Sequence, residues 1–244
     1  MGRGKTAGEV SEGMLLDLGI GIITLPLPLG MGSVNCYLLR AGDGYVLIDT
    51  GPPKAWDVLG RELHSLGCKP GSLNLTILTH GDFDHTGNAA SIRNTFGGTL
   101  AMHPADARMA EIGDMFAGRK RANFILRALV PRLIGFGTSE RFIPDVLLED
   151  GASLSEYGLK ARVISIPGHS EGSIGILTVD GHFFCGDMFE NRKKPAVNSL
   201  IDDRDAADRS AEKLAALKIG MVYPGHGTAF SMDELSERPT QGGP

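Results

Sequence analysis

The sequence predicts an α/β (α+β) fold in which two β-sheets pack together and helices cover their outer faces. Two observations predict it. Short apolar strand patterns alternate with helical patterns, and the two halves of the chain carry similar β and then α content. The length of 244 residues suffices for one sizeable layered domain, and no linker-like segment divides it. We therefore expect a single domain over residues 1–244, with a flexible leader at 1–13 and a flexible tail at 231–244.

The first half of the chain begins with strand patterns. Residues 20–29 form an apolar stretch interrupted by Pro26 and Pro28, which suits a strand at the edge of a sheet. Two more strands, at 34–40 and 45–49, are joined by a short turn of Ala, Gly, Asp and Gly, so a β-hairpin is expected here.

Helical and strand patterns then alternate. Strands are predicted at 75–79 and 99–102, and helices before and after the first of them, each ending at glycine. The apolar side chains expected to face the core are Trp56, Leu59, Leu63 and Leu66 in the first helix and Ala89, Ile92 and Phe96 in the second.

Residues 106–143 interrupt this alternation. Two apolar helical stretches follow each other, and the second carries Arg121, Arg127 and Arg132 between its apolar side chains, which predicts a helical insertion. The insertion either packs on the core or forms a lid over a substrate pocket or a surface for a homodimer.

The second half contains more strands and one long helix. Alanine and leucine recur at helical spacing over 204–218, which predicts a helix with one buried face. Strand patterns cover residues 146–149, 159–166, 174–179, 183–185 and 221–223.

Composition and charge exclude several classes of function. The net charge of −5 gives no basic field to attract a phosphate backbone, so no nucleic acid partner is expected. The three cysteines are an odd number without CxxC spacing, which argues against a disulfide framework and favours a reducing cytoplasm. Neither an apolar run of about 18 residues nor a signal-peptide pattern occurs, so we expect a cytoplasmic protein without a membrane span.

Residues 79–88 carry the strongest chemical signal. Directly after an apolar strand pattern come four polar side chains, His80, Asp82, Asp84 and His85. They should gather where a buried strand ends, and imidazole and carboxylate are the ligands of zinc, iron and manganese. A helix N-cap with a solvated acidic turn is the alternative, but the density of the cluster favours a metal site.

Three further strand patterns end in a similar way. A Pro-Gly pair precedes His169 and again precedes His226, and Asp187 follows a Cys-Gly pair. Because proline stops the strand and glycine lets the backbone turn, each side chain should lie at the exit of a strand. Seven candidate ligands suit two divalent cations, which lower the pKa of a shared water and polarise a carbonyl or phosphoryl oxygen. The implied chemistry is hydrolysis.

This order of residues resembles the metallo-β-lactamase superfamily over residues 20–230. The motifs that carry the resemblance are Asp49-Thr50-Gly51, Thr79-His80, Asp84-His85-Thr86-Gly87-Asn88, Pro167-Gly168-His169-Ser170, Gly186-Asp187 and Pro224-Gly225-His226-Gly227. The set is highly specific, although any single piece would be weak. The resemblance implies a four-layer αββα sandwich with the metals in a cleft at one edge.

The resemblance also implies a role for each ligand. Two metals would share one carboxylate, with His80 and His169 on the first metal, Asp84, His85 and His226 on the second, and Asp187 as the bridge. Asp84 and Asp187 are the catalytic candidates, and Asp84 would orient a metal-bound hydroxide. Asp49 would support the ligand loop, unless it only ends a strand in a turn.

One position departs from the family pattern. The family usually has a second histidine where this chain has Asp82. Asp82 would bind the first metal directly, bind it through water, or leave it one ligand short. Zinc is the expected cofactor at both sites, with iron or manganese as alternatives because an anionic oxygen ligand favours harder ions.

The predicted function is hydrolysis of a small-molecule ester, thioester, lactone or amide by a metal-bridging hydroxide. Arg192, Lys193 and Lys194 would hold an anionic substrate, although a solvated basic turn fits their pattern better. Flavodiiron proteins resemble the Asp82 variation, so a di-iron oxidoreductase is the second candidate. A metal or ligand sensor without turnover is the third, because one ligand is altered.

Overall fold

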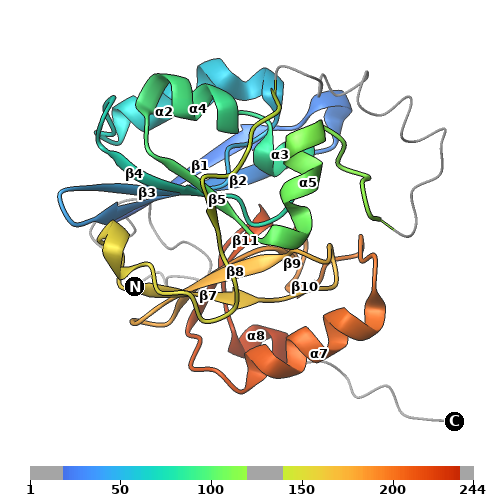
Figure 1. The fold of residues 1–244 in the computed structure, drawn as a ribbon. Coiled ribbons are helices and arrows are strands. Elements are labelled where there is room, and N and C mark those ends of the chain that lie inside the picture. Colours follow the sequence, from blue (N-terminus) through green and yellow to red (C-terminus); the bar gives the residue numbers. More distant parts are fainter. Residues whose placement is uncertain (1–18, 120–139, 237–244) are drawn as a thin grey trace, which may run out of the picture.

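The computed structural model describes residues 19–119 and 140–236, which form two β-sheets packed face to face (Figure 1). The predicted leader, the second apolar stretch of the insertion and the last eight residues of the predicted tail lie outside the described residues. Among the described helices, none combines the length and the apolar character needed to cross a membrane.

The first sheet has six strands in the order β1-β2-β3-β4-β5-β6. They are β1 (Ile20–Pro26), β2 (Ser33–Ala41), β3 (Gly44–Ile48), β4 (Leu73–Ile77), β5 (Thr99–Met102) and β6 (Val146–Leu147). β1 pairs antiparallel with β2 and lies at the edge, as its prolines predict, and β2 and β3 form the expected hairpin. From β3 to β6 the pairing is parallel, so the ends of β3 and β4 meet at one rim.

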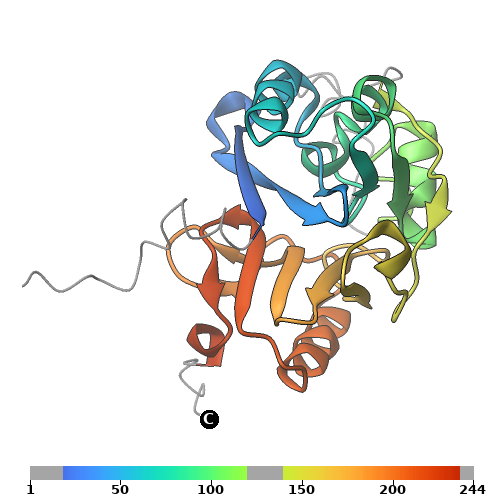
Figure 2. The ribbon, with the colours of Figure 1, turned by 90° about the vertical axis from the view of Figure 1, so that its left-hand side faces the viewer.

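The second sheet has the order β12-β11-β9-β8-β7, with β10 paired to β9. Its strands are β7 (Ala161–Ser165), β8 (Ile174–Thr178), β9 (His182–Asn191), β10 (Ala196–Val197), β11 (Met221–Gly227) and β12 (Phe230–Ser231). Figure 2 shows this sheet, in yellow to red, stacked against the blue and green first sheet.

Helices cover both outer faces (Figure 1). The helices that accompany the first sheet are α2 (Trp56–Ser65), α3 (Phe83–Thr86), α4 (Ala89–Phe96) and α5 (Pro104–Ile112), and those beneath the second are α7 (Arg204–Ala215) and α8 (Asp233–Ser236). Within the described residues, short 3-10 turns occupy Pro28–Gly30, Pro53–Ala55 and Ser155–Tyr157.

The three largest buried apolar clusters of the described residues hold the layers together. Tyr37 of the first sheet packs with Phe184 and Tyr223 of the second in the cluster between the sheets. Leu59 and Phe96 belong to the cluster under α2 and α4. A third cluster joins the second sheet to α7 and α8. The four-layer αββα sandwich that the sequence predicts is therefore confirmed.

Several predicted boundaries were wrong in detail. The strand expected at 183–185 runs over His182–Asn191, and the one expected at 221–223 runs over Met221–Gly227. Both strands continue because β9 and β11 pair in parallel with each other. Two register shifts let this pairing continue across the Pro-Gly pair of β11. The strand expected at 20–29 ends at Pro26, and the helix expected over 204–218 ends at Ala215. The pairing partners β9 and β11 are separated in the sequence by β10 and α7, so a local pattern could not show how far they extend.

Candidate metal centre

The strand β4 delivers the first four candidate ligands to the gap between the sheets. After its last residue, the chain turns, Asp82 takes the N-cap position of α3, and Asp84 and His85 lie within α3. Asp82 has the extended backbone of an N-cap, but its side chain makes no capping hydrogen bond. The carboxylate is turned inward and its side chain is only 11% exposed. The alternative of a solvated acidic turn is therefore wrong.

The second sheet delivers the other three candidate ligands. His169 follows the end of β7, whereas Asp187 lies inside β9 and His226 inside β11. The prediction that all three occupy strand exits is thus right for His169 and wrong for the other two. The register shifts of β11 next to Pro224 turn His226 toward Asp187 instead.

All seven predicted side chains come together in one buried cluster. Their ligand atoms form three overlapping groups: His80, Asp82 and His169; Asp84, His85 and His226; and His80, His85 and Asp187. The first two groups coincide with the two sets expected for two metals. The third group connects them, with Asp187 Oδ1 3.2 Å from His85 Nε2 and Asp187 Oδ2 3.3 Å from His226 Nε2.

The four histidines share one orientation. Each Nδ1 atom faces outward to an oxygen, namely Thr79 Oγ1 for His80, Asp49 Oδ2 for His85, the Leu200 carbonyl for His169 and the Ser33 carbonyl for His226. Carbonyl and carboxylate oxygens accept, and the Thr79 hydroxyl gives its own hydrogen to Asp49, so each Nδ1 carries a hydrogen and Nε2 faces the cluster. Outer partners of this kind orient ligating imidazoles in metal sites.

Asp49 organises the outer side of the cluster. Its carboxylate accepts hydrogen bonds from the Thr79 backbone N–H at 2.8 Å, from Thr79 Oγ1 and from His85 Nδ1 at 2.8 Å. Its own φ of +62° lies in the left-handed region, at the point where β3 ends. This geometry matches the expected support of the ligand loop.

Inward-facing atoms of the cluster lack hydrogen-bond partners. His80 Nε2, His85 Nε2 and Asp187 Oδ1 are fully buried and make no hydrogen bond of good geometry, although the last two lie 3.2 Å apart. A buried acceptor without a partner costs about 1–3 kcal/mol, and here three lie within one cluster. A cation bound by these atoms would remove that cost, so the residues present fit two metal ions.

The charges of the cluster also favour cations. Burial raises the pKa of Asp187, but His226 and His85 outweigh burial and hold the pKa of this carboxyl well below its usual range. Burial lowers the pKa of His226, whereas Asp187 and Asp84 raise it, and the result is a pKa of about 10. Protons and metal ions therefore compete for the same imidazoles.

Two residues of the centre were missed by sequence reasoning. Arg119 forms a buried ion pair with Asp82 Oδ1, and its other terminal nitrogen donates to the His169 carbonyl at 3.1 Å. Asn198 Nδ2 donates to Asp187 Oδ2 at 3.2 Å. Neither residue belongs to a motif, and both are distant from their partners in the sequence. Only the preference of a buried carboxylate for a cation could have suggested that Asp82 needed an arginine.

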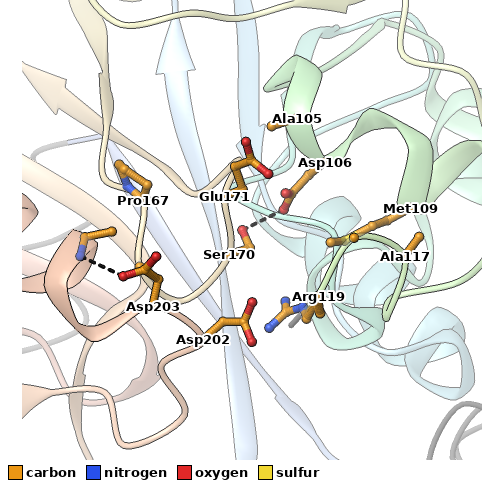
Figure 3. A pocket seen from close by; sticks show the side chains of 13 residues that line it. Ala105, Asp106, Met109, Ala117, Arg119, Pro167, Ser170, Glu171, Asp202 and Asp203 are labelled. Carbon is orange, nitrogen blue, oxygen red and sulfur yellow. Dashed lines mark hydrogen bonds between the residues drawn. The ribbon is translucent and has the colours of Figure 1, made fainter. Parts of the chain in front are cut away.

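The centre borders a small pocket that Arg119 lines (Figure 3). The pocket has a volume of about 250 Å³, and Asp106, Ser170, Glu171 and Asp202 also line it. Asp106 is not available as a ligand, because it accepts hydrogen bonds from Gly81 N, Ser170 Oγ and Gly172 N.

The basic segment after β9 lies on the surface. Arg192 pairs with Glu190 at 3.1 Å, and Lys193 and Lys194 are exposed. Their exposure fits a solvated turn, but the same three cations line a pocket together with Asn198 and Leu200, so the binding of an anionic substrate here stays a prediction.

Comparison with known proteins places this geometry in a family. The model of the "Metallo-beta-lactamase superfamily" matches residues 29–226. The human metallo-beta-lactamase domain-containing protein 1 is 28% identical over 218 residues, which are 88% of this chain and 71% of that protein. The hydroxyacylglutathione hydrolase of Anaeromyxobacter dehalogenans is 28% identical over 191 residues, 78% of this chain and 60% of that enzyme.

Solved structures agree in fold. A metallo-beta-lactamase family protein from Thermus thermophilus superposes with a TM-score of 0.68 at 23% identity, covering 87% of this chain and 75% of its own. The protein TTHA1623, solved in a di-iron-bound form, gives a TM-score of 0.66 at 26% identity. The match covers 88% of this chain and 98% of that protein. The family model spans well over half of the sequence and the architecture agrees with it, so the chain belongs to the metallo-beta-lactamase superfamily.

Proposed function

We propose that this chain is a metal-dependent hydrolase with a dinuclear centre, acting on an acyl-type small molecule. The observation that supports it is the convergence of four imidazole Nε2 atoms and three carboxylates in one buried cluster that contains unpartnered acceptors. Such a donor set suits two divalent cations, with zinc as the first expectation.

The candidate ligands would have different roles in the reaction. Bound divalent cations would supply Lewis acidity and an activated water near neutral pH. Asp187 would hold both cations, and Asn198 keeps its Oδ2 in place. Asp84 lies on the His226 side, with 3.4 Å between Asp84 Oδ2 and His226 Nε2, where it would orient the attacking water.

A thioester is the first substrate to test. The relative named hydroxyacylglutathione hydrolase is 28% identical over 78% of this chain, and an acyl-glutathione is a thioester. Esters, lactones and amides are the next substrates to test, since attack of water on a carbonyl carbon also hydrolyses them.

The test is replacement of the bridging candidate. Asp187→Asn should lower hydrolysis by more than about 100-fold, because even an outer partner of a ligand contributes about 10–100-fold. Asp180→Asn, at an exposed turn, is the matched control and should keep full activity. Circular dichroism checks that both variants are folded. Full activity in Asp187→Asn would contradict the proposal, and silence of the wild-type protein across the whole substrate panel would favour a sensor.

A di-iron oxidoreductase is the second candidate. It is favoured by the similarity to a protein solved in a di-iron-bound form and by the carboxylate at position 82. Metal analysis of protein purified without added metal separates the two functions. Two irons together with oxygen- or nitric-oxide-reducing activity and no hydrolysis would establish the second candidate and exclude the first.

A further inference from the structure

We infer that Asp82 and Arg119 act as one neutral unit that takes the place of a ligating histidine at the first metal position. Arg119 is thus a positioning residue that sets how Asp82 binds and which metal the His80, Asp82 and His169 group prefers. The inference rests on the metal-binding part of the proposed function and does not depend on hydrolysis.

The geometry leaves Asp82 a single free ligand atom. Its Oδ1 is bonded to the Arg119 guanidinium, whereas its Oδ2 lies 3.0 Å from His169 Nε2 and 3.6 Å from His80 Nε2. A carboxylate alone can offer both oxygens to a cation. Held in this way, it offers one atom at the inner end of the side chain, as an imidazole does.

The charges of the pair cancel at close range. The Asp82 and Arg119 side chains are only 11% and 12% exposed, so solvent screens their interaction weakly. Viewed from the metal position, a carboxylate bonded to a guanidinium carries no net charge, and a neutral imidazole also carries none. The departure from the family motif is therefore compensated by a residue 37 positions further along the chain.

Arg119 is held in place from the side opposite the metal centre. Its second terminal nitrogen donates to the His169 carbonyl, which ties Arg119 to another member of the same ligand group. Figure 3 shows Asp202 facing Arg119 in the adjoining pocket, and Glu171 also lines this pocket. These acidic neighbours offset the repulsion that bound cations would exert on the guanidinium.

The pair changes the metal preference expected from the sequence. An uncompensated aspartate would favour harder ions such as manganese. With its charge cancelled and one oxygen blocked, Asp82 should act as a weak single-atom ligand beside two imidazoles, a set that suits zinc. Removal of Arg119 should thus free the charge and both oxygens of Asp82 and shift the preference of this group from zinc toward manganese.

A double-mutant cycle on the full chain tests the inference, with the proteins wild type, Arg119→Met, Asp82→His and the double variant. Stepwise zinc affinities are measured by competition with a chromogenic chelator, and metal content is measured after equilibration with equal zinc and manganese. We expect Arg119→Met to raise the ratio of bound manganese to bound zinc about 10–100-fold, the range typical for an outer partner of a ligand. In the Asp82→His background, the same change should leave this ratio unchanged, because no carboxylate is then freed, and zinc affinity should stay the same or rise, because Arg119 is an unpaired cation near the metal.

An equal change of the manganese-to-zinc ratio in both backgrounds, or no change beside Asp82, would overturn the inference. If an Asp82→His protein does not fold, Asp82→Asn replaces it in the cycle, since the amide also leaves Arg119 without its anion. Wild-type protein that binds two zinc ions and hydrolyses nothing would contradict the proposed function alone and leave this test intact.

Discussion

Asp49 connects backbone geometry to the ligand set at the scale of single residues. Its left-handed φ of +62° aims the carboxylate at Thr79 and His85, and aspartate tolerates this region better than most residues. The hydroxyl of Thr79 donates to Asp49 and accepts from His80 Nδ1. One carboxylate therefore orients two ligating imidazoles.

Replacement of Asp49 by asparagine should weaken metal binding. Asparagine keeps the size and the tolerance of positive φ but lacks the charge that supports His85, so we expect zinc affinity to fall about 10–100-fold. Chelator competition measures it, and Asp208→Asn on the exposed side of α7 is the control. An unchanged affinity would mean that Asp49 only ends β3 in a turn.

The clustering of the seven candidate ligands could be predicted from the sequence because each lies in a short motif after or within an apolar strand. The prediction did not extend to Arg119, which contacts Asp82 only through the folded chain. Charge compensation over such a separation leaves no local pattern. The expectation that Asp82 favours harder metal ions was therefore made without Arg119, the residue that cancels the charge of Asp82.

At the scale of elements, β11 brings backbone unusually close to the ligands. It passes the Pro-Gly pair through two register shifts, and a Cβ atom built at Gly225 would lie 2.7 Å from His85 Cε1 and closer still to Asp187 Oδ1. Only glycine fits between these two side chains. The glycine was expected to allow a turn, whereas in the structure it makes room for the cluster.

Gly225→Ala should therefore disturb the centre directly. The added methyl group must displace Asp187 or His85, so we expect loss of bound metal and a loss of about 1–3 kcal/mol in unfolding free energy. Gly220→Ala is a matched control, since its Cβ would meet only a carbonyl oxygen at 3.7 Å. Metal content and thermal unfolding measure both effects, and equal behaviour of the two variants would contradict the close-approach argument.

At the scale of the whole molecule, the centre joins the two sheets. Side chains of β2 reach β11, with Tyr37 Oη donating to the Pro224 carbonyl at 2.7 Å and Asn35 Nδ2 to the Gly227 carbonyl at 2.8 Å. Four candidate ligands come from the first sheet and three from the second. The layers followed from the alternation of patterns, but the order and register within a sheet depend on pairings such as that of β9 with β11, which no local pattern records.

This arrangement makes the stability of the metal-free protein depend on pH. The pKa of His226 is raised from 6.5 in an unperturbed imidazole to about 10 in the fold, chiefly because Asp187 outweighs the effect of burial, and the pKa values of His85 and His169 are raised as well. A raised pKa in the folded state stabilises the protein fully below the unfolded value, and this contribution is lost as pH rises toward the folded value.

Chelator-treated protein should thus lose unfolding free energy between pH of about 6.5 and about 10, by up to about 1.4 kcal/mol per pH unit for each imidazole that stays protonated in the fold. Metal ions displace these protons, so zinc-loaded protein should show little dependence over the same window and a higher stability throughout. Urea unfolding at several pH values measures the slopes. His226→Gln should show a smaller slope without metal, because one raised imidazole is gone. In this account, carboxylates from both sheets keep the histidines protonated until a metal ion replaces the protons. A stability of the metal-free wild type that rises with pH over this window would contradict it.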